Sequence, residues 1–284
     1  MSAWGYGDAG LPCGSRVIFG TQFPYALLMG RLLGGTAEPD LVVVWGANPG
    51  ESQPLNLMRP IMDAKAKGAR LAVIDPRFTI TASKADAYLG VRPGTDSALA
   101  LGLMHVIIKA ELHDVPFLMR HSTGPYLVRN DTGKYLRGKD LGLEEELAYV
   151  VWDTAGDGPA LRNSDGITPA IAGTYMVNGM ACKTAFELLK DLCAAYAPQK
   201  TSEITGIAPD LILNLAKRMG KARETTFVTH MGFTRTYHGD ISLRALGTVA
   251  TITGNVMATF KGGHLPAVLN WKPFLKAVPD KPSY

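Results

Sequence analysis

The sequence lacks features that are characteristic of several classes of protein. Its 284 residues include only three cysteines, Cys13, Cys182 and Cys193, too few for the disulfide framework of a small secreted domain. No uninterrupted apolar run reaches membrane-spanning length. The N-terminus is rich in glycine and lacks the charged segment of a secretory signal. These absences exclude a disulfide-stapled scaffold and predict no direct membrane span.

An excess of charge of one sign is also missing. The formal net charge is only +4, and the Lys and Arg residues are scattered rather than arranged in a stripe. Because nucleic-acid binding needs a basic patch, we expect no nucleic-acid partner. With 46% hydrophobic residues, the chain can bury a sizeable core in one large domain or two modest ones.

Residues 41–96 carry the clearest pattern in the chain. Residues 41–45 form an apolar run of strand length that ends in the turn sequence WGANPG. Residues 71–74 form a second such run, which ends in Asp-Pro-Arg. Between the two runs, apolar residues fall at helical spacing: Leu55, Met58, Ile61 and Met62. Strand, helix and strand in this order predict a βαβ unit, whose ligands bind beyond the carboxyl ends of the strands.

Three polar loops therefore lie where a ligand is expected. They are Trp45 to Pro49, Asp75 to Arg77, and Gly94 to Asp96. Thr95 is expected to be the N-cap of a helix that runs from Asp96 to about Ala110. A carboxylate in the first turn of a helix is favoured by the helix dipole.

The same pattern returns late in the chain. Residues 224–230 predict a third strand, followed by the loop MGFTRTYHG and a helix from residue 241. We therefore predict an α/β fold with Rossmann-like parallel-sheet units in two related halves that face one cofactor crevice, with a hairpin-rich insertion. The expected division is 1–40, a loop and helix segment; 41–121, the first α/β half; 122–182, the insertion; 183–263, the second half; and 264–284, an irregular tail.

These motifs, in this order, resemble those of the molybdopterin oxidoreductases of the dimethyl sulfoxide reductase type. The resemblance spans roughly residues 5–263 and is most specific where Asp-Pro-Arg after a strand precedes Pro-Gly-Thr-Asp at a helix start. It implies molybdenum or tungsten held between two molybdopterin guanine dinucleotides. It also implies two-electron oxo- or sulfur-group transfer to a small-molecule substrate, with an iron–sulfur electron-transfer subunit as partner.

The resemblance also implies roles for single residues. Asp96 would read guanine, and Asp75 the ribose side. The remaining cofactor contacts that it implies are Trp45, Gly46, Asn48, Arg77, Gly94, Thr95, Gly232, Phe233, Arg235 and His238. Most of these positions have a structural alternative, and for Trp45 core packing is the better reading from the sequence. Cys182 and Cys193 are expected in the core, in or beside an apolar helix.

Cys13 is the expected metal ligand. It lies in the sequence Leu-Pro-Cys-Gly-Ser upstream of the first strand, where the family carries such a ligand, and a thiolate suits a soft metal. Asp8 and Ser15 remain alternatives. Formate-oxidising members carry His where this chain has Gly14, and this difference argues against formate as substrate.

The family's N-terminal 4Fe–4S motif and its C-terminal closing domain have no counterpart in the sequence, so we expect the central part of a longer catalytic subunit. Three alternatives stay open. A non-catalytic scaffold relative would have the fold without the metal, and a non-redox hydratase occurs in the family. An ordinary Rossmann enzyme would carry Gly-x-Gly-x-x-Gly after residue 45, whereas the chain has Gly46-x-x-x-Gly50 with Pro49.

Overall fold

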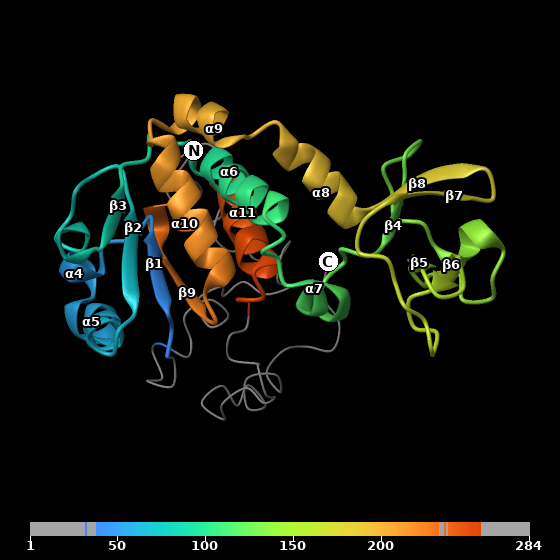
Figure 1. The fold of residues 1–284 in the computed structure, drawn as a ribbon, viewed down its shortest axis with the longest axis horizontal. Coiled ribbons are helices and arrows are strands. Elements are labelled where there is room, and N and C mark those ends of the chain that lie inside the picture. The colour runs from blue at the N-terminus through green and yellow to red at the C-terminus, as the bar shows by residue number, and fades with distance from the viewer. Residues whose placement is uncertain (1–31, 33–37, 233–235, 237, 257–284) are drawn as a thin grey trace, which may run out of the picture.

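The structure is a computed structural model, and it describes residues 32, 38–232, 236 and 238–256 (Figure 1). In chain order its elements are β1 (Leu41–Trp45), α4 (Pro49–Ser52), the π-helix η1 (Pro54–Met58), α5 (Arg59–Ala66), β2 (Arg70–Ile74), the 3-10 helix η2 (Ala82–Lys84), β3 (Ala87–Leu89), α6 (Asp96–Lys109), α7 (Val115–His121), β4 (Leu127–Arg129), the 3-10 helix η3 (Gly138–Leu141), β5 (Val150–Asp153), β6 (Gly158–Leu161), β7 (Thr174–Val177), β8 (Met180–Thr184), α8 (Ala185–Ala194), α9 (Pro198–Thr205), α10 (Pro209–Lys221), β9 (Thr225–Thr229) and α11 (Gly239–Ile252).

The centre of the molecule is a four-stranded parallel sheet in the order β3-β2-β1-β9. Val43 in β1 pairs with Ala72 on one side and with Phe227 on the other. Every residue of β1 and of β9 is buried, as is usual for parallel strands covered on both faces. The α/β fold predicted from the sequence is confirmed, and the late strand joins the same sheet as the early ones.

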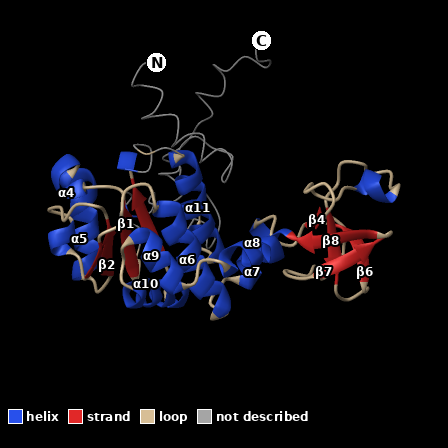
Figure 2. Ribbon diagram, turned by 90° about the horizontal axis from the view of Figure 1, so that it is seen from above, coloured by secondary structure: helices blue, strands red, loops and turns tan. Residues whose placement is uncertain are grey.

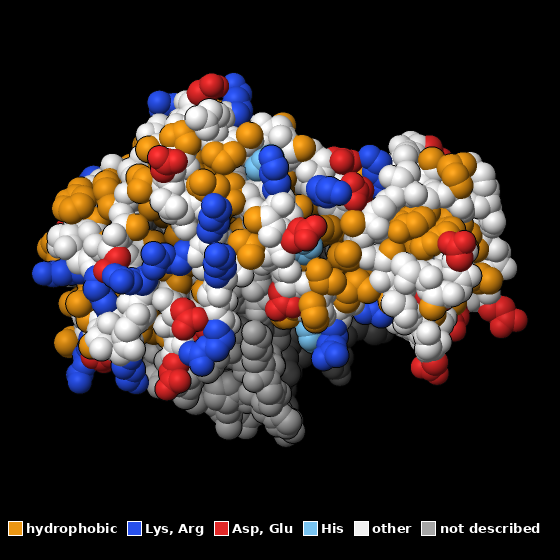
Figure 3. Space-filling model, viewed as in Figure 1, with side chains coloured by type: hydrophobic (Ala, Val, Ile, Leu, Met, Phe, Trp, Pro, Cys, Tyr) orange, Lys and Arg blue, Asp and Glu red, His pale blue; other side chains and the backbone are white. Residues whose placement is uncertain are grey.

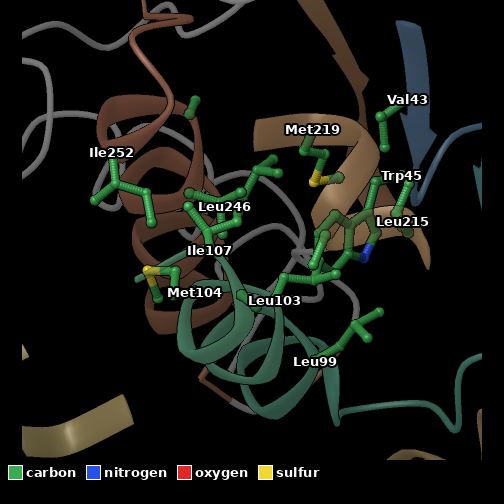
Figure 4. Packing of buried hydrophobic residues seen from close by; sticks show 14 of the residues in the cluster. Val43, Trp45, Leu99, Leu103, Met104, Ile107, Leu215, Met219, Leu246 and Ile252 are labelled. Atoms are coloured by element: carbon green, nitrogen blue, oxygen red, sulfur yellow. The ribbon is translucent and has the colours of Figure 1, made fainter. Parts of the chain in front are cut away.

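Helices cover the sheet on both faces. On one face α6, α10 and α11 pack on side chains such as Val43 and Trp45, and Figure 4 shows this core at close range. On the other face Ile61 of α5 packs on Val42 and Val44. Successive side chains of β1 therefore pack into two separate cores on opposite faces of the sheet, which fixes the register of this strand.

The segment between β1 and β2 differs from the expected regular helix. Leu55 is 75% exposed, whereas Leu57 is buried against the sheet. The physical reason is the π-helical turn over Pro54–Met58, which changes the helical period before α5 begins. The assignment of Leu55 to the apolar face is therefore wrong, while Ile61 is buried as expected.

Between α7 and α8 the chain forms antiparallel structure, which extends to one side of the molecule (Figure 2). It consists of a three-stranded sheet, β4-β8-β7, and a two-stranded sheet, β5-β6. Leu127, Val150 and Cys182 contribute to a small core of its own. Both cysteines are buried as expected: Cys182 lies in β8, which directly precedes α8, and Cys193 lies in α8.

No helix in the part of the chain that the structure describes is long and apolar enough to span a bilayer.

Candidate cofactor-binding site

The loops that follow β1 and β9 meet at the carboxyl ends of the parallel strands. Gly46 directly follows β1, has a φ of +65°, and accepts a hydrogen bond from the backbone N–H of Gly232 at 3.0 Å. A Cβ atom on Gly232 would collide with the carbonyl oxygen of Gly46. Glycine is therefore needed at position 232 because two backbones approach closely there. The two predicted site loops are in direct contact.

Trp45 and Asp96 form a buried hydrogen bond beside these loops. The indole Nε1 of Trp45 donates to Oδ1 of Asp96 at 2.8 Å. The Trp45 side chain is fully buried, so its ring is not a surface on which a ligand could stack. Asp96 is 9% exposed and is the first residue of α6. Burial raises the pKa of this carboxyl, while the Trp45 hydrogen bond and the backbone N–H of Asp96 lower it and the charge of Asp75 raises it.

Asp75 lies at the end of β2 and is partly exposed. Its Oδ1 accepts a hydrogen bond from the backbone N–H of Arg77 at 2.8 Å, and the Tyr88 hydroxyl donates to its carbonyl oxygen at 2.9 Å. Burial raises the pKa of the Asp75 carboxyl, and Arg77 opposes that shift. The guanidinium of Arg77 is exposed and lies 3.6 Å from Glu51. Asp75, just after β2, therefore lies near enough to Asp96, at the start of α6, for its charge to raise the pKa of Asp96.

Asn48 braces the first loop. Its Oδ1 accepts a hydrogen bond from the Thr81 hydroxyl at 2.7 Å, and the same hydroxyl oxygen accepts from the backbone N–H of Gly50 at 2.9 Å. The Asn48 side chain makes no capping bond to α4. Thr81 was not predicted from the sequence, because the bond joins two loops that the sequence separates.

A cleft of about 580 Å³ lies between the first turns of α6 and α11. Each of these helices has 14 residues, and their N-terminal backbone N–H groups and dipoles favour an anion. The lining includes the predicted residues Gly94 and His238, whose φ angles are +79° and +58°. Thr95 occupies the N-cap position of α6, but its hydroxyl donates to the Arg92 carbonyl instead of capping the helix.

The cleft also contains residues that the sequence did not single out. They are Pro93, Ser97, Thr236, Ile241 and Ser242. The Oγ1 atom of Thr236 is buried and has no hydrogen-bond partner among the residues that the structure describes. A hydroxyl at or next to a helix start is the one sequence signal that could have found Ser97 and Ser242.

Five predicted residues fall outside the described part of the chain. These are Cys13, Asp8, Ser15, Phe233 and Arg235. Within the described residues, no group of His, Cys, Asp and Glu side chains could hold a metal ion.

A larger cleft, of about 830 Å³, lies at the amino ends of the strands, where β1, β2 and β3 begin. Lys217, Arg218 and Lys221 of α10 line it, and Figure 3 shows basic side chains gathered over this helix. Ligands of parallel α/β sheets bind at the carboxyl ends of the strands, so the smaller cleft is the better candidate site.

Comparison with known proteins identifies the family. The family model described as molybdopterin oxidoreductase matches residues 6–270. The chain belongs to the molybdopterin oxidoreductase family. The resemblance seen in the sequence is thereby confirmed.

Several characterised oxidoreductase proteins are similar to the chain. It is 30% identical over 217 residues to the F420-dependent formate dehydrogenase subunit alpha of Methanocaldococcus jannaschii, covering 76% of this chain and 23% of that protein. It is 30% identical to the dimethyl sulfoxide reductase DmsA of Escherichia coli, covering 76% and 22%. It is 28% identical to the perchlorate reductase subunit alpha of Dechloromonas aromatica, covering 82% and 29%. The chain thus spans about a quarter of the length of these relatives.

A solved structure shares the fold. Acetylene hydratase from Pelobacter acetylenicus superposes with a TM-score of 0.52 at 21% identity, covering 77% of this chain and 22% of that one.

The described residues fit the phosphate-bearing molybdopterin cofactor of this family. Two helix N-termini offer backbone N–H donors to phosphate, and the Gly46–Gly232 hydrogen bond holds the loops after β1 and β9 together beside them. Asp75 directly after β2 and Asp96 at the start of α6 provide carboxylate acceptors, and Thr236 in the cleft offers a hydroxyl that has no partner among the described residues.

Proposed function

We propose that the chain forms the cofactor-binding part of a molybdenum or tungsten oxidoreductase, with two molybdopterin guanine dinucleotides. The proposal rests chiefly on the loop contact between Gly46 and Gly232, because the resemblance assigns these glycines to different dinucleotides. The neighbouring cleft between two helix N-termini, with Asp96 as the first residue of α6, supports it further.

Each residue has a distinct task in this proposal. Asp96 accepts the two adjacent donors of a guanine edge, and Asp75 accepts from ribose hydroxyls. The N-terminus of α6, at Gly94 and Thr95, and that of α11 stabilise phosphate groups. His238 and Gly232, with Phe233 and Arg235, serve the second dinucleotide. Trp45, Asn48 and Arg77 belong to the protein surroundings of the first dinucleotide.

When bound, the metal supplies two-electron oxo- or sulfur-group transfer. The role of the chain is to hold and orient the cofactor and to exclude water from it. Cys13 is the proposed protein ligand, with Asp8 and Ser15 as alternatives, because a thiolate donates charge to a soft metal. A 4Fe–4S cluster in an N-terminal part and an iron–sulfur partner subunit would carry the electrons to or from the site.

Metal and nucleotide content test this proposal together. The longest native form of the polypeptide should be purified from a host that makes the cofactor. We expect about one molybdenum or tungsten atom and about two guanine nucleotides per chain, as one bis-dinucleotide cofactor requires. Metal is measured by mass spectrometry, and GMP is quantified after acid hydrolysis.

Substitutions assign the result to residues. Asp96→Asn should lower the guanine content, because an amide cannot accept two donors side by side as a carboxylate can. Asp63→Asn is a matched control, since Asp63 is an exposed carboxylate on α5. Cys13→Ala should lower the metal content. A folded full-length protein that contains no metal would contradict the proposal and favour the scaffold alternative. A metal-containing protein that catalyses hydration but exchanges no electrons with its substrate would favour the hydratase.

A further inference from the structure

The Trp45–Asp96 hydrogen bond connects the end of β1 to the start of α6. Donor and acceptor are 2.8 Å apart and 51 residues apart in the sequence. Both side chains are buried, where a hydrogen bond is stronger and more directional than in water. The bond therefore fixes the carboxylate relative to the sheet.

Core packing fixes the direction of the indole N–H. Figure 4 shows the Trp45 ring next to Leu103 of α6 and Leu215 and Met219 of α10. Phenylalanine could occupy most of this space but has no N–H group. The hydrogen bond is therefore the property of Trp45 that packing alone does not require.

The bonds from Trp45 and from the backbone N–H of Asp96 occupy two of the roughly four acceptor positions of the carboxylate, so acceptor positions remain for a ligand. Guanine presents N1–H and an exocyclic amine side by side, and a carboxylate can accept both when its plane is aligned with them. The torsion angle that turns this plane is soft in aspartate. We propose that Trp45 is a positioning residue that holds the Asp96 carboxylate in the plane needed to read guanine, an inference that rests on the proposed function.

The charged surroundings of Asp96 predict how removal of the bond would appear. Burial raises the pKa of Asp96, the Trp45 N–H and its own backbone N–H lower it, and the charge of Asp75, just after β2, raises it. The helices α10 and α11 meet this part of the core through apolar residues such as Leu215 and Leu246. Loss of the indole N–H therefore raises the pKa of Asp96. As the pH is lowered, the carboxylate of the variant becomes protonated, and stops accepting from guanine, at a higher pH than that of the wild-type protein.

GMP binding as a function of pH tests the inference on the 284-residue chain. Wild-type protein and the Trp45→Phe variant are titrated with GMP by calorimetry, with AMP as the probe that lacks the guanine donor pair. We expect Trp45→Phe to weaken GMP binding about tenfold, which corresponds to ~1.4 kcal/mol. We also expect the acidic midpoint of binding to move to higher pH. Trp152→Phe is the matched control, because Trp152 stacks on Tyr175 in the antiparallel part of the molecule.

The outcomes separate this inference from the proposed function. A merely structural role would weaken GMP binding equally at every pH, and an unchanged midpoint would overturn the inference alone. Equal GMP affinity of wild-type protein and variant would do the same. If the wild-type chain bound neither GMP nor AMP, or bound both equally, the guanine-binding role of Asp96 would fall together with this inference.

Discussion

At the scale of single residues, the candidate site keeps negative charge in a place that disfavours it. Asp96 is nearly buried, and Asp75 lies close enough for its charge to raise the pKa of Asp96. Burial is also the main cause of the raised pKa of Asp75. Groups whose ionisation is penalised in the folded state are frequent at functional sites, because the cost is offset only when a ligand binds.

The raised pKa of Asp96 predicts a pH-dependent cost to stability. The folded state retains this proton to a higher pH than the unfolded state, so stability falls as pH rises from about 4 through the folded pKa. Asp96→Asn removes this fall. Urea unfolding at a series of pH values should therefore show a variant that gains stability over wild type as pH rises through this window, and no further above it.

The comparison needs a matched exposed site. Asp63→Asn, on the surface of α5, should give a difference from wild type that is small and nearly constant over the same pH range. An Asp96→Asn variant whose stability followed wild type in parallel would mean that burial of this carboxyl carries no cost.

At the scale of elements, the site depends on two neighbouring strands that end together. β1 and β9 pair over their full length, and the loops after them touch through Gly46 and Gly232. The first loop is braced from the side by the Thr81 hydroxyl. The loop geometry is thus set by backbone contacts, which leave no space for side chains.

Gly232→Ala tests this close approach. The added methyl group would collide with the Gly46 carbonyl, so the loops must move apart, at a cost of about 1–3 kcal/mol in unfolding free energy. Cofactor content should fall with it. Chemical denaturation measures the first effect and metal analysis the second.

Gly158→Ala provides the control for that substitution. A Cβ atom there would lie 3.8 Å from its nearest contact, the carbonyl oxygen of Gly156, which is an ordinary distance. The change should be about 0.5 kcal/mol or less. Similar losses for both variants would show that position 232 tolerates a side chain.

At the scale of the whole molecule, stability should be unevenly distributed. β1 is buried along its length and has a strand on either side, whereas β6 pairs with β5 alone among the described strands and is partly exposed. Amides of β1 should exchange hydrogen only on global unfolding, and those of β6 through local opening. Exchange measured by mass spectrometry should be much faster in β6, and equal protection would contradict this division.

The sequence predicts the parts of this structure that depend on near neighbours. Apolar runs and the Pro-Gly before Asp96 place β1, β2 and α6 within a residue or so of their observed bounds. The partnership of Trp45 with Asp96 could not be read from the sequence, because it depends on how α6 packs on the sheet. The same holds for the Gly46–Gly232 contact and for the exposure of Leu55, which depends on a π-helical turn.

The place of β9 beside β1 also sets the order of events on the ribosome. β1 emerges early, but its second neighbour starts at Thr225, after the whole antiparallel part has been made. At about 5–20 residues per second, one side of β1 stays unpaired for on the order of ten seconds or more. The nascent chain must keep that edge from pairing elsewhere. Because the two site loops meet only after β9 has joined the sheet, the contact between Gly46 and Gly232 forms later than the pairing of β1 with β2.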